Sequence, residues 1–249
     1  MKKLLLILLI SGFSFTQAQV TIGIKTDYNL SRIAGDWEDL LEDYADFNLE
    51  TFNIELNFDP KFKGGFNAGV YAEILISENF YLQPELMYSL KGVRFDDSFD
   101  FEGEFGGFYA DVNGDYEYRQ SLHYLELPVF AKYKSNGGFI LFGGPYIAYL
   151  LSAKGELIID ATYTTNAFGF PFSGNQEIER PGLEKENFKK IDFGIAGGIG
   201  YEFPFGLGIN ARYVKGLINI SEDLEDEMYT NSSMQFGVYY KIVGFDKKE

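Results

Sequence analysis

The sequence predicts an all-β fold, an eight-stranded antiparallel up-and-down transmembrane β-barrel with long extracellular loops. Three observations predict it. Several stretches alternate apolar and polar side chains with the period of two that is typical of strands. The connections between these stretches alternate between long and short. Aromatic residues make up 18% of the chain although the mean hydropathy is close to neutral at −0.12. Membrane barrels combine these features, because each strand faces lipid on one side and the lumen on the other, with aromatic girdles at both interfaces.

The predicted strands cover residues 20–30, 65–76, 80–95, 122–133, 139–151, 188–203, 207–220 and 232–242. The second is the cleanest, since Phe66, Ala68 and Val70 alternate with Asn67 and Gly69. About ten residues at ~3.3 Å each, tilted near 40°, span the ~25 Å apolar band of an outer membrane.

Long connections are expected at residues 31–63, 96–117, 155–187 and 221–231, and short turns at 77–79, 136–137 and 204–206. This order suits eight strands with both chain ends on the periplasmic side. A soluble β-sandwich is the alternative, but it has no reason to alternate loop length so regularly. Within the first long connection, residues 36–46 have helical spacing, and residues 52–58 alternate like a strand. A barrel of ten strands therefore stays open.

The hairpin at residues 122–151 has the most specific turn. Asn136-Gly137 favours a two-residue type I′ turn, because both central residues need a positive φ. That turn would pair Tyr133 with Ile140 and direct Ile140, Phe142 and Tyr146 outward, whereas a slip by one residue would reverse the facing. Both faces of this strand are apolar, so both arrangements stay open.

The N-terminus has the pattern of a secretory signal peptide. Lys2 and Lys3 precede a short apolar run, and residues 16–18 have the small side chains of a cleavage site. We therefore expect a signal peptide at residues 1–18, a barrel at 19–245 and a C-terminal tail at 246–249. The chain contains no cysteine, which excludes lipid anchoring through that residue, disulfides and thiolate metal sites.

The mature chain is strongly acidic. Without Lys2 and Lys3 it has 19 basic and 37 acidic residues, a formal net charge of −18. Nucleic-acid binding needs a basic surface and is therefore not expected.

Several pieces of the chain resemble a known family. Residues 81–92 (YLQPELMYSLKG), 124–128 (YLELP) and 142–146 (FGGPY) are similar to strands of the PorT-type outer-membrane β-barrels of Bacteroidetes. Residues 192–200 and 213–220 resemble later strands of that family. The resemblance implies a cell outer-membrane location and the barrel fold. One type of member is tied to type IX protein secretion, but no residue here carries that role over.

Charged residues on the polar side of the strands should point into the lumen. They are Lys25, Asp27, Glu73, Glu85, Lys91, Glu126, Lys132, Asp192, Glu202, Arg212 and Lys241. Eight strands enclose only enough space for side chains, so these charges must pair. Lys25, Glu85, Glu126 and Arg212 lie near mid-depth, and we predict that they form a central ion-pair cluster. The cluster is either a structural plug or the gate of a narrow ion path.

The long connections are the second candidate site. Residues 31–60 contain nine acidic residues, 96–117 contain eight and 221–231 contain five. They are either a solvated surface or a site for a basic protein or a divalent cation. Asp111, Asn113, Asp115 and Glu117 are weak calcium candidates, because the glycine that an EF-hand loop needs at its sixth position is absent. An Asn113-Gly114 hairpin turn explains this stretch better.

Three further features carry weaker predictions. His123 is the only histidine and shares a strand face with Ser121, which would suit a lipid-active enzyme. The glycines between residues 194 and 200 are interpreted as strand kinks, because no helix follows them. Pro84, Pro128 and Pro145 should lie at β-bulges, and Pro128 should face Pro145 across the hairpin.

The sequence favours a non-enzymatic, monomeric outer-membrane barrel without a cofactor, which binds partners through its acidic extracellular loops and contacts outer-membrane lipid. A porin-like narrow pore, or a transport or secretion accessory, is the alternative, and a lipid-active enzyme is a third possibility.

Overall fold

The computed structural model describes residues 19–35, 37, 59–105, 108–166, 172–222 and 228–245. Its strands are β1 (Val20–Ala34), β2 (Lys63–Ser77), β3 (Phe80–Phe105), β4 (Phe108–Lys134), β5 (Phe139–Thr165), β6 (Phe172–Glu184), β7 (Ile191–Glu202), β8 (Leu207–Gly216) and β9 (Thr230–Phe245). A short 3-10 helix, η2 (Lys185–Asn187), links β6 to β7. Within these described residues, no helix is long and apolar enough to cross a bilayer.

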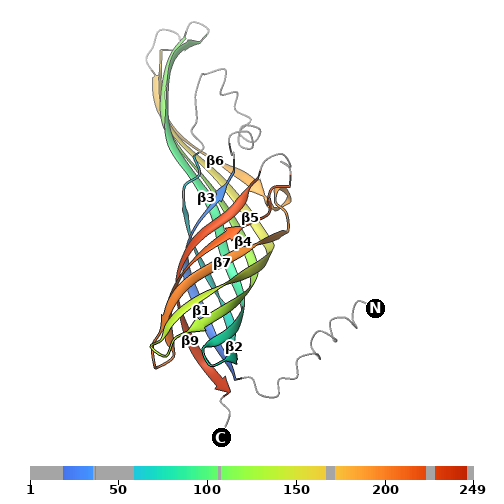
Figure 1. The fold of residues 1–249 in the computed structure, drawn as a ribbon. Coiled ribbons are helices and arrows are strands. Elements are labelled where there is room, and N and C mark those ends of the chain that lie inside the picture. Colours follow the sequence, from blue (N-terminus) through green and yellow to red (C-terminus); the bar gives the residue numbers. More distant parts are fainter. Residues whose placement is uncertain are drawn as a thin grey trace, which may run out of the picture.

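Eight of the nine strands close into a ring (Figure 1). The order around the ring is β1, β2, β3, β4, β5, β7, β8 and β9, and β9 pairs with β1 from Val20–Phe245 to Ala34–Thr230. Every pairing is antiparallel. The prediction of eight barrel strands is confirmed. Residues 38–58, which carried most of the predicted helix and the extra strand, lie outside the described residues.

The barrel exterior is apolar, whereas its interior combines charged, polar and aromatic side chains. Exposed side chains on β1 are Ile22, Ile24 and Tyr28, whereas the alternate residues Lys25, Asp27 and Asn29 are buried. The same alternation holds on β7, where Ile191, Phe193 and Ile195 are exposed. A soluble barrel has the opposite arrangement, so this exterior suits a hydrocarbon solvent.

The main departure from the prediction is above the ring. The described residues of the predicted loops 96–117 and 155–187 lie mostly in strands, because β3, β4 and β5 continue about twelve residues beyond the barrel and β6 pairs along β5. The four strands form what we call the projecting sheet: residues 94–105, 108–119, 154–165 and 172–184. At ~3.4 Å per residue it extends on the order of 40 Å from the barrel, at the end opposite the C-terminus in Figure 1.

The prediction of a hairpin turn at Asn113-Gly114 is wrong. Both residues lie inside β4, where Asn113 pairs with Asp100 and Gly114 with Phe99. The pairing of β3 with β4 continues to Phe105–Phe108, and residues 106–107 lie outside the described residues. A two-residue turn signal was overridden here by a cross-strand register that is the same from Phe80–Tyr133 to Phe105–Phe108.

The turn between β4 and β5 has three residues rather than two. The Gly138 amide donates to the Ser135 carbonyl, and Gly138 takes a φ of +86° that favours glycine. Tyr133 therefore pairs with Leu141, and the slip by one residue is the arrangement that occurs. Ile140, Phe142 and Tyr146 are buried in the lumen, and Pro128 faces Tyr146 rather than Pro145.

The predicted bulges at the prolines are also wrong. The register is the same on both sides of Pro84 and Pro128, although some ladder pairs are missing there, and Pro145 pairs regularly with Ile195. The register shifts instead at residues 22–23, 75–77, 123–124 and 154–156. A proline lacks only its own backbone N–H, so it removes one hydrogen bond of the ladder. Losing that bond costs less free energy than a shift of the register, which would turn every neighbouring side chain to the other face.

Glycines on the luminal side of β7 make room for larger neighbours. A Cβ at Gly194 would lie 2.6 Å from the Tyr146 ring, and one at Gly198 would lie 2.8 Å from the Arg212 Cβ. These close approaches explain the glycines without a nucleotide-binding role, in agreement with the interpretation as strand features.

Candidate functional site

The lumen contains three stacked layers of ion pairs. All of the predicted inward-facing charges lie there, and Lys134, which the sequence reasoning missed, joins them. Lys134 follows the same alternation as Lys132, so the strand period was the signal that would have found it. In the part of the chain that the structure describes, and with Lys134 included, six basic and six acidic side chains form these luminal ion pairs, and their charges balance.

The middle ion layer consists of Lys25, Asp27, Glu85 and Arg212. The Arg212 guanidinium donates to Glu85 at 2.8 Å and to Asp27 at 3.2 Å, and Lys25 lies 3.4 Å from Glu85. None of the four is more than 5% exposed. Lys25 and Asp27 are alternate residues of β1, whereas Glu85 lies on β3 and Arg212 on β8. The layer therefore forms only when the ring is closed.

Glu126 does not belong to the middle layer, so the predicted central cluster is correct for three of its four residues. Glu126 pairs with Lys91 at 2.5 Å, and Lys91 lies 3.8 Å from Asp192. These three residues form the upper ion layer. Lys91 also lies over the Tyr146 ring at 4.6 Å, and the Tyr146 hydroxyl donates to Asp192 at 3.0 Å. Two carboxylates and an aromatic ring thus stabilise the buried Lys91 ammonium.

The lower ion layer consists of Glu73, Lys132, Lys134, Glu202 and Lys241. Lys241 bridges Glu73 and Glu202 at 2.9 Å each, and Lys132 lies 2.5 Å from Glu73. At the opposite end of the lumen, Trp37 is buried against Phe95 and Tyr229, with ring centroids 5.2 and 5.4 Å apart. Ion layers and an aromatic cap fill the barrel interior, which gives the barrel a packed core.

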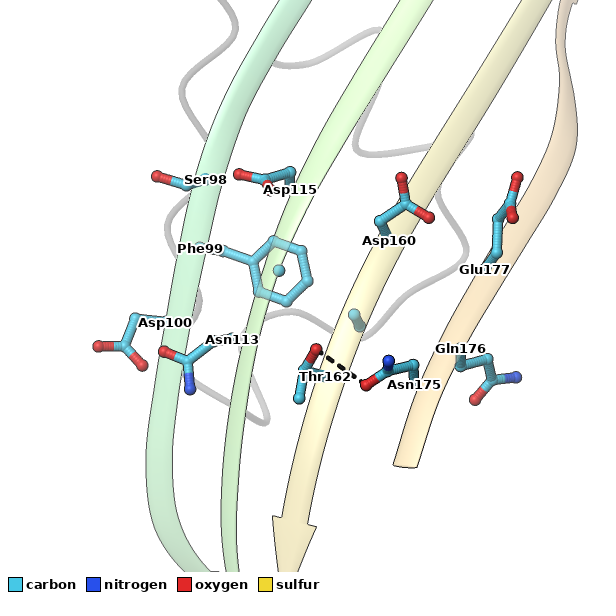
Figure 2. Close-up of a pocket in the computed structure, with 12 residues that line it drawn as sticks. Ser98, Phe99, Asp100, Asn113, Asp115, Asp160, Thr162, Asn175, Gln176 and Glu177 are labelled. Atoms are coloured by element: carbon cyan, nitrogen blue, oxygen red, sulfur yellow. Dashed lines mark hydrogen bonds between the residues drawn. The ribbon is translucent and has the colours of Figure 1, made fainter. Parts of the chain in front are cut away.

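The outward face of the projecting sheet carries the second cluster of charge. Ser98, Asp115, Asp160 and Glu177 are register partners across four neighbouring strands, so three carboxylates stand in one row. Figure 2 shows this row with Asp100, Asn113, Thr162 and Asn175 beside it. These residues line a shallow hollow of about 750 Å³.

We call Asp115, Asp160 and Glu177 the carboxylate row. Like charges directly opposite each other on a sheet are destabilising, so the row opposes its own folding unless a cation or solvent screens it. In the same sheet the Tyr109 hydroxyl donates to Glu102 at 2.7 Å, and this hydrogen bond raises the pKa of Tyr109 to about 12. Ionising the tyrosine here would add a further negative charge to an acidic surface.

The calcium candidates do not form a loop. Asp111, Asn113, Asp115 and Glu117 are alternate residues of β4 and stand in a line along one sheet face. Asn113 donates its side-chain amide to the Asp111 carboxylate at 2.7 Å, so an amide N–H of Asn113 is directed at that carboxylate. Within the described residues, no group of three or more acidic or histidine side chains has the geometry to hold a metal ion.

His123 lies on the barrel exterior, at the upper border of the apolar belt. Its Nδ1 is 2.5 Å from the Tyr88 hydroxyl of the neighbouring strand, and its register partners are Leu90 and Ser152. The ring is therefore paired with a tyrosine rather than aligned with Ser121.

The chain was compared with known proteins. It matches the family of the outer membrane protein beta-barrel domain over residues 15–222. No curated protein matches it.

Similar solved structures are outer-membrane barrels. The attachment invasion locus protein Ail of Yersinia pestis is 13% identical, with 90% of this chain and 99% of that chain covered and a TM-score of 0.37. Neisserial surface protein A is 10% identical, with the same coverage and a TM-score of 0.41. The N-terminal β-barrel domain of Pseudomonas aeruginosa OprF is 10% identical, with 88% of this chain and 97% of that chain covered and a TM-score of 0.26.

The closed ring, the apolar exterior and the family match agree with one another. The chain is a member of the outer membrane protein beta-barrel domain family and resides in the outer membrane.

Proposed function

We propose that this protein is a non-enzymatic outer-membrane barrel that presents the acidic face of its projecting sheet to a basic protein outside the cell. The observation that carries the proposal is the carboxylate row, Asp115, Asp160 and Glu177, on three adjacent strands. A binding partner with clustered lysines or arginines would remove the mutual repulsion of these carboxylates.

The polarity of the sheet supports this proposal. Away from the barrel rim, its outward face adds Asp100, Glu102 and Asp111 to the carboxylate row, and the basic residues Arg94, Arg119 and Lys154 lie only at the barrel end. A long-range field of one sign accelerates the encounter with an oppositely charged partner. Three of the four strands of the sheet continue directly from the barrel, which places this face above the barrel.

Binding of poly-lysine to the protein in lipid nanodiscs tests this function. The triple variant Asp115→Asn, Asp160→Asn, Glu177→Gln should bind poly-lysine at least about tenfold more weakly at low salt. The matched control changes Glu78, Glu184 and Glu186 to glutamine, which alters the net charge equally outside the row. If the two triple variants weaken binding to the same extent, only net charge matters and the proposal fails.

The packed lumen supports a structural core rather than a porin-like pore. Three ion layers would have to rearrange before an ion could pass, and each broken pair would leave a buried charge. Recordings in planar bilayers should therefore show no reproducible single-channel steps. Reproducible steps would favour the pore instead.

The finer family assignment, to the PorT-type barrels of Bacteroidetes, rests on the sequence pieces at residues 81–92, 124–128 and 142–146. A role in secretion would follow only if the neighbouring genes encode secretion components, which inspection of the genome would establish. We propose no catalysis at His123. His123→Ala should leave the lipid composition of the host membrane unchanged, and an altered composition would contradict this.

A further inference from the structure

Basic residues gather at the upper border of the apolar belt on β2, β3 and β4. Arg94 and Arg119 are direct register partners across β3 and β4, and Lys61 bridges to Arg94. Lys63 begins β2 beside them. We call Lys61, Lys63, Arg94 and Arg119 the rim basic patch. Two arginines placed directly opposite each other repel, so an anion that both can contact would stabilise this pair.

The side chain of Lys63 reaches toward β4. Its Cδ lies 3.1 Å from the position that a Cβ at Gly92 would occupy, and Gly92 pairs with Ser121. Ser121 lies two residues from both Arg119 and His123 on the same strand face. The Lys63 ammonium is close enough to Arg119 and His123 that its charge acts on both. Because Gly92 has no side chain, the Lys63 side chain can pass over β3 toward β4.

The rim basic patch has four cations, and the three nearby carboxylates do not neutralise all of them. Asp96 accepts from Lys61 at 2.9 Å and lies 2.9 Å from Arg94, and Glu117 holds Arg119. Glu156 lies opposite Arg119 on β5. Within the described part of the chain, Lys63 makes no ion pair, so one cation of the patch has no protein carboxylate to neutralise it.

The height of the patch matches that of a lipid headgroup. On the outward side of β3, Phe80 pairs with Tyr133 near one border of the apolar belt, and Leu90 lies ten residues higher. At ~3.3 Å per residue and a tilt near 40° this is ~25 Å, the height of the apolar band. Arg94 lies four residues above Leu90, ~10 Å along the membrane normal by the same arithmetic. Long basic side chains at that level meet phosphate groups.

We infer that the rim basic patch binds the phosphate group of a lipid headgroup in the outer leaflet, held by Lys63 and Arg119 with Arg94 in reach. The Ser121 hydroxyl lies between Lys63 and Arg119 and can donate to the same phosphate. This site lies below the carboxylate row on the same sheet, and it does not depend on the proposed function of that row.

Native mass spectrometry of the detergent-solubilised protein tests this inference, with phosphatidic acid and phosphatidylcholine as probes. The wild type should retain phosphatidic acid preferentially and saturably. Lys63→Gln should weaken this binding about tenfold, the effect of losing one charge-assisted hydrogen bond. The double variant Lys63→Gln, Arg94→Gln should weaken it further.

The matched control is Lys215→Gln, which removes one positive charge on β8, on the other side of the ring. Lys215 donates to Thr230 at 2.9 Å and lies far from the patch in the strand order. It should leave the affinity for phosphatidic acid unchanged. Three results would overturn the inference: equal loss in the control, no loss in Lys63→Gln, or displacement of the lipid by inorganic phosphate at millimolar concentration, which would identify a free anion as the ligand.

Discussion

The lumen and the projecting sheet use charged residues in opposite ways. Among the described residues of the lumen, each charged side chain forms an ion pair, and six basic residues balance six acidic ones. On the projecting sheet, carboxylates face carboxylates across neighbouring strands. Burial explains the difference, because an unpaired charge in the lumen costs several kcal/mol, whereas water and salt screen an exposed row at little cost.

The two regions are nevertheless parts of the same strands. β3, β4 and β5 each run from the ring into the sheet without a break. The inward side changes from paired ions to aromatic residues at the barrel mouth, and the outward side changes from apolar residues through Arg94 and Arg119 to carboxylates. The solvent therefore changes along each strand from lipid to water, and the residue types follow it.

The largest effect is expected from a substitution that removes one charge from the middle ion layer of the lumen. Arg212→Gln removes one of the two cations of the middle ion layer and leaves Lys25 alone against two buried carboxylates, Asp27 and Glu85. The free energy of unfolding should fall by about 3–5 kcal/mol. Urea unfolding from lipid vesicles, followed by tryptophan fluorescence of the single Trp37, measures it. The further change Glu85→Gln should restore part of the loss, and a larger loss in the double variant would contradict the pairing.

A smaller effect is expected in the lower ion layer. Lys241→Gln leaves Lys134 and Lys132 near Glu73 and Glu202, and the Lys241 side chain is 19% exposed. Water and the remaining lysines can compensate, so the loss should be about 1 kcal/mol in the same unfolding measurement. A loss equal to that of Arg212→Gln would show that the lower ion layer is shielded from water as well as the middle layer.

In the carboxylate row, removing a charge should raise the stability of the projecting sheet rather than lower it. Asp160→Asn removes the central charge between Asp115 and Glu177 and should stabilise the sheet by about 0.2–1 kcal/mol. Proteolysis of the projecting sheet at low salt measures this local stability. The gain should shrink at high salt, and a salt-independent change would mean that repulsion within the row is not its cause.

The smallest effect is a pH dependence at the barrel rim. The hydrogen bond from Lys61, together with Arg94, lowers the pKa of Asp96 below its ordinary value of 3.8. The linked stability is therefore fully present above pH 3.8 and is lost as the pH falls through the lowered pKa. Amide hydrogen exchange of the Lys61–Arg94 bridge should accelerate in that window. Asp96→Asn should remove the dependence, and a persistent dependence would assign it to another group.

The strand period alone determined the ring and most of its interior. Alternation in residues 20–30 and 65–76 separates lipid-facing from luminal side chains, because adjacent side chains of a strand point to opposite faces whatever the strand pairs with. The same rule placed Lys25, Glu85 and Arg212 inside. In residues 156–164, polar side chains occupy every second position except Ile158, so the projecting sheet had a readable strand signal, but polar composition favoured a loop.

Only the tertiary structure decided the register, and with it the partners of each charge. One residue in the turn before Phe139 determined which side of β5 enters the lumen. Glu126 joined Lys91 rather than Arg212 because depth in a tilted barrel depends on the stagger between strands, which no single strand encodes. Asp115, Asp160 and Glu177 became one row for the same reason, since residues from β4, β5 and β6 become neighbours only through pairing across strands.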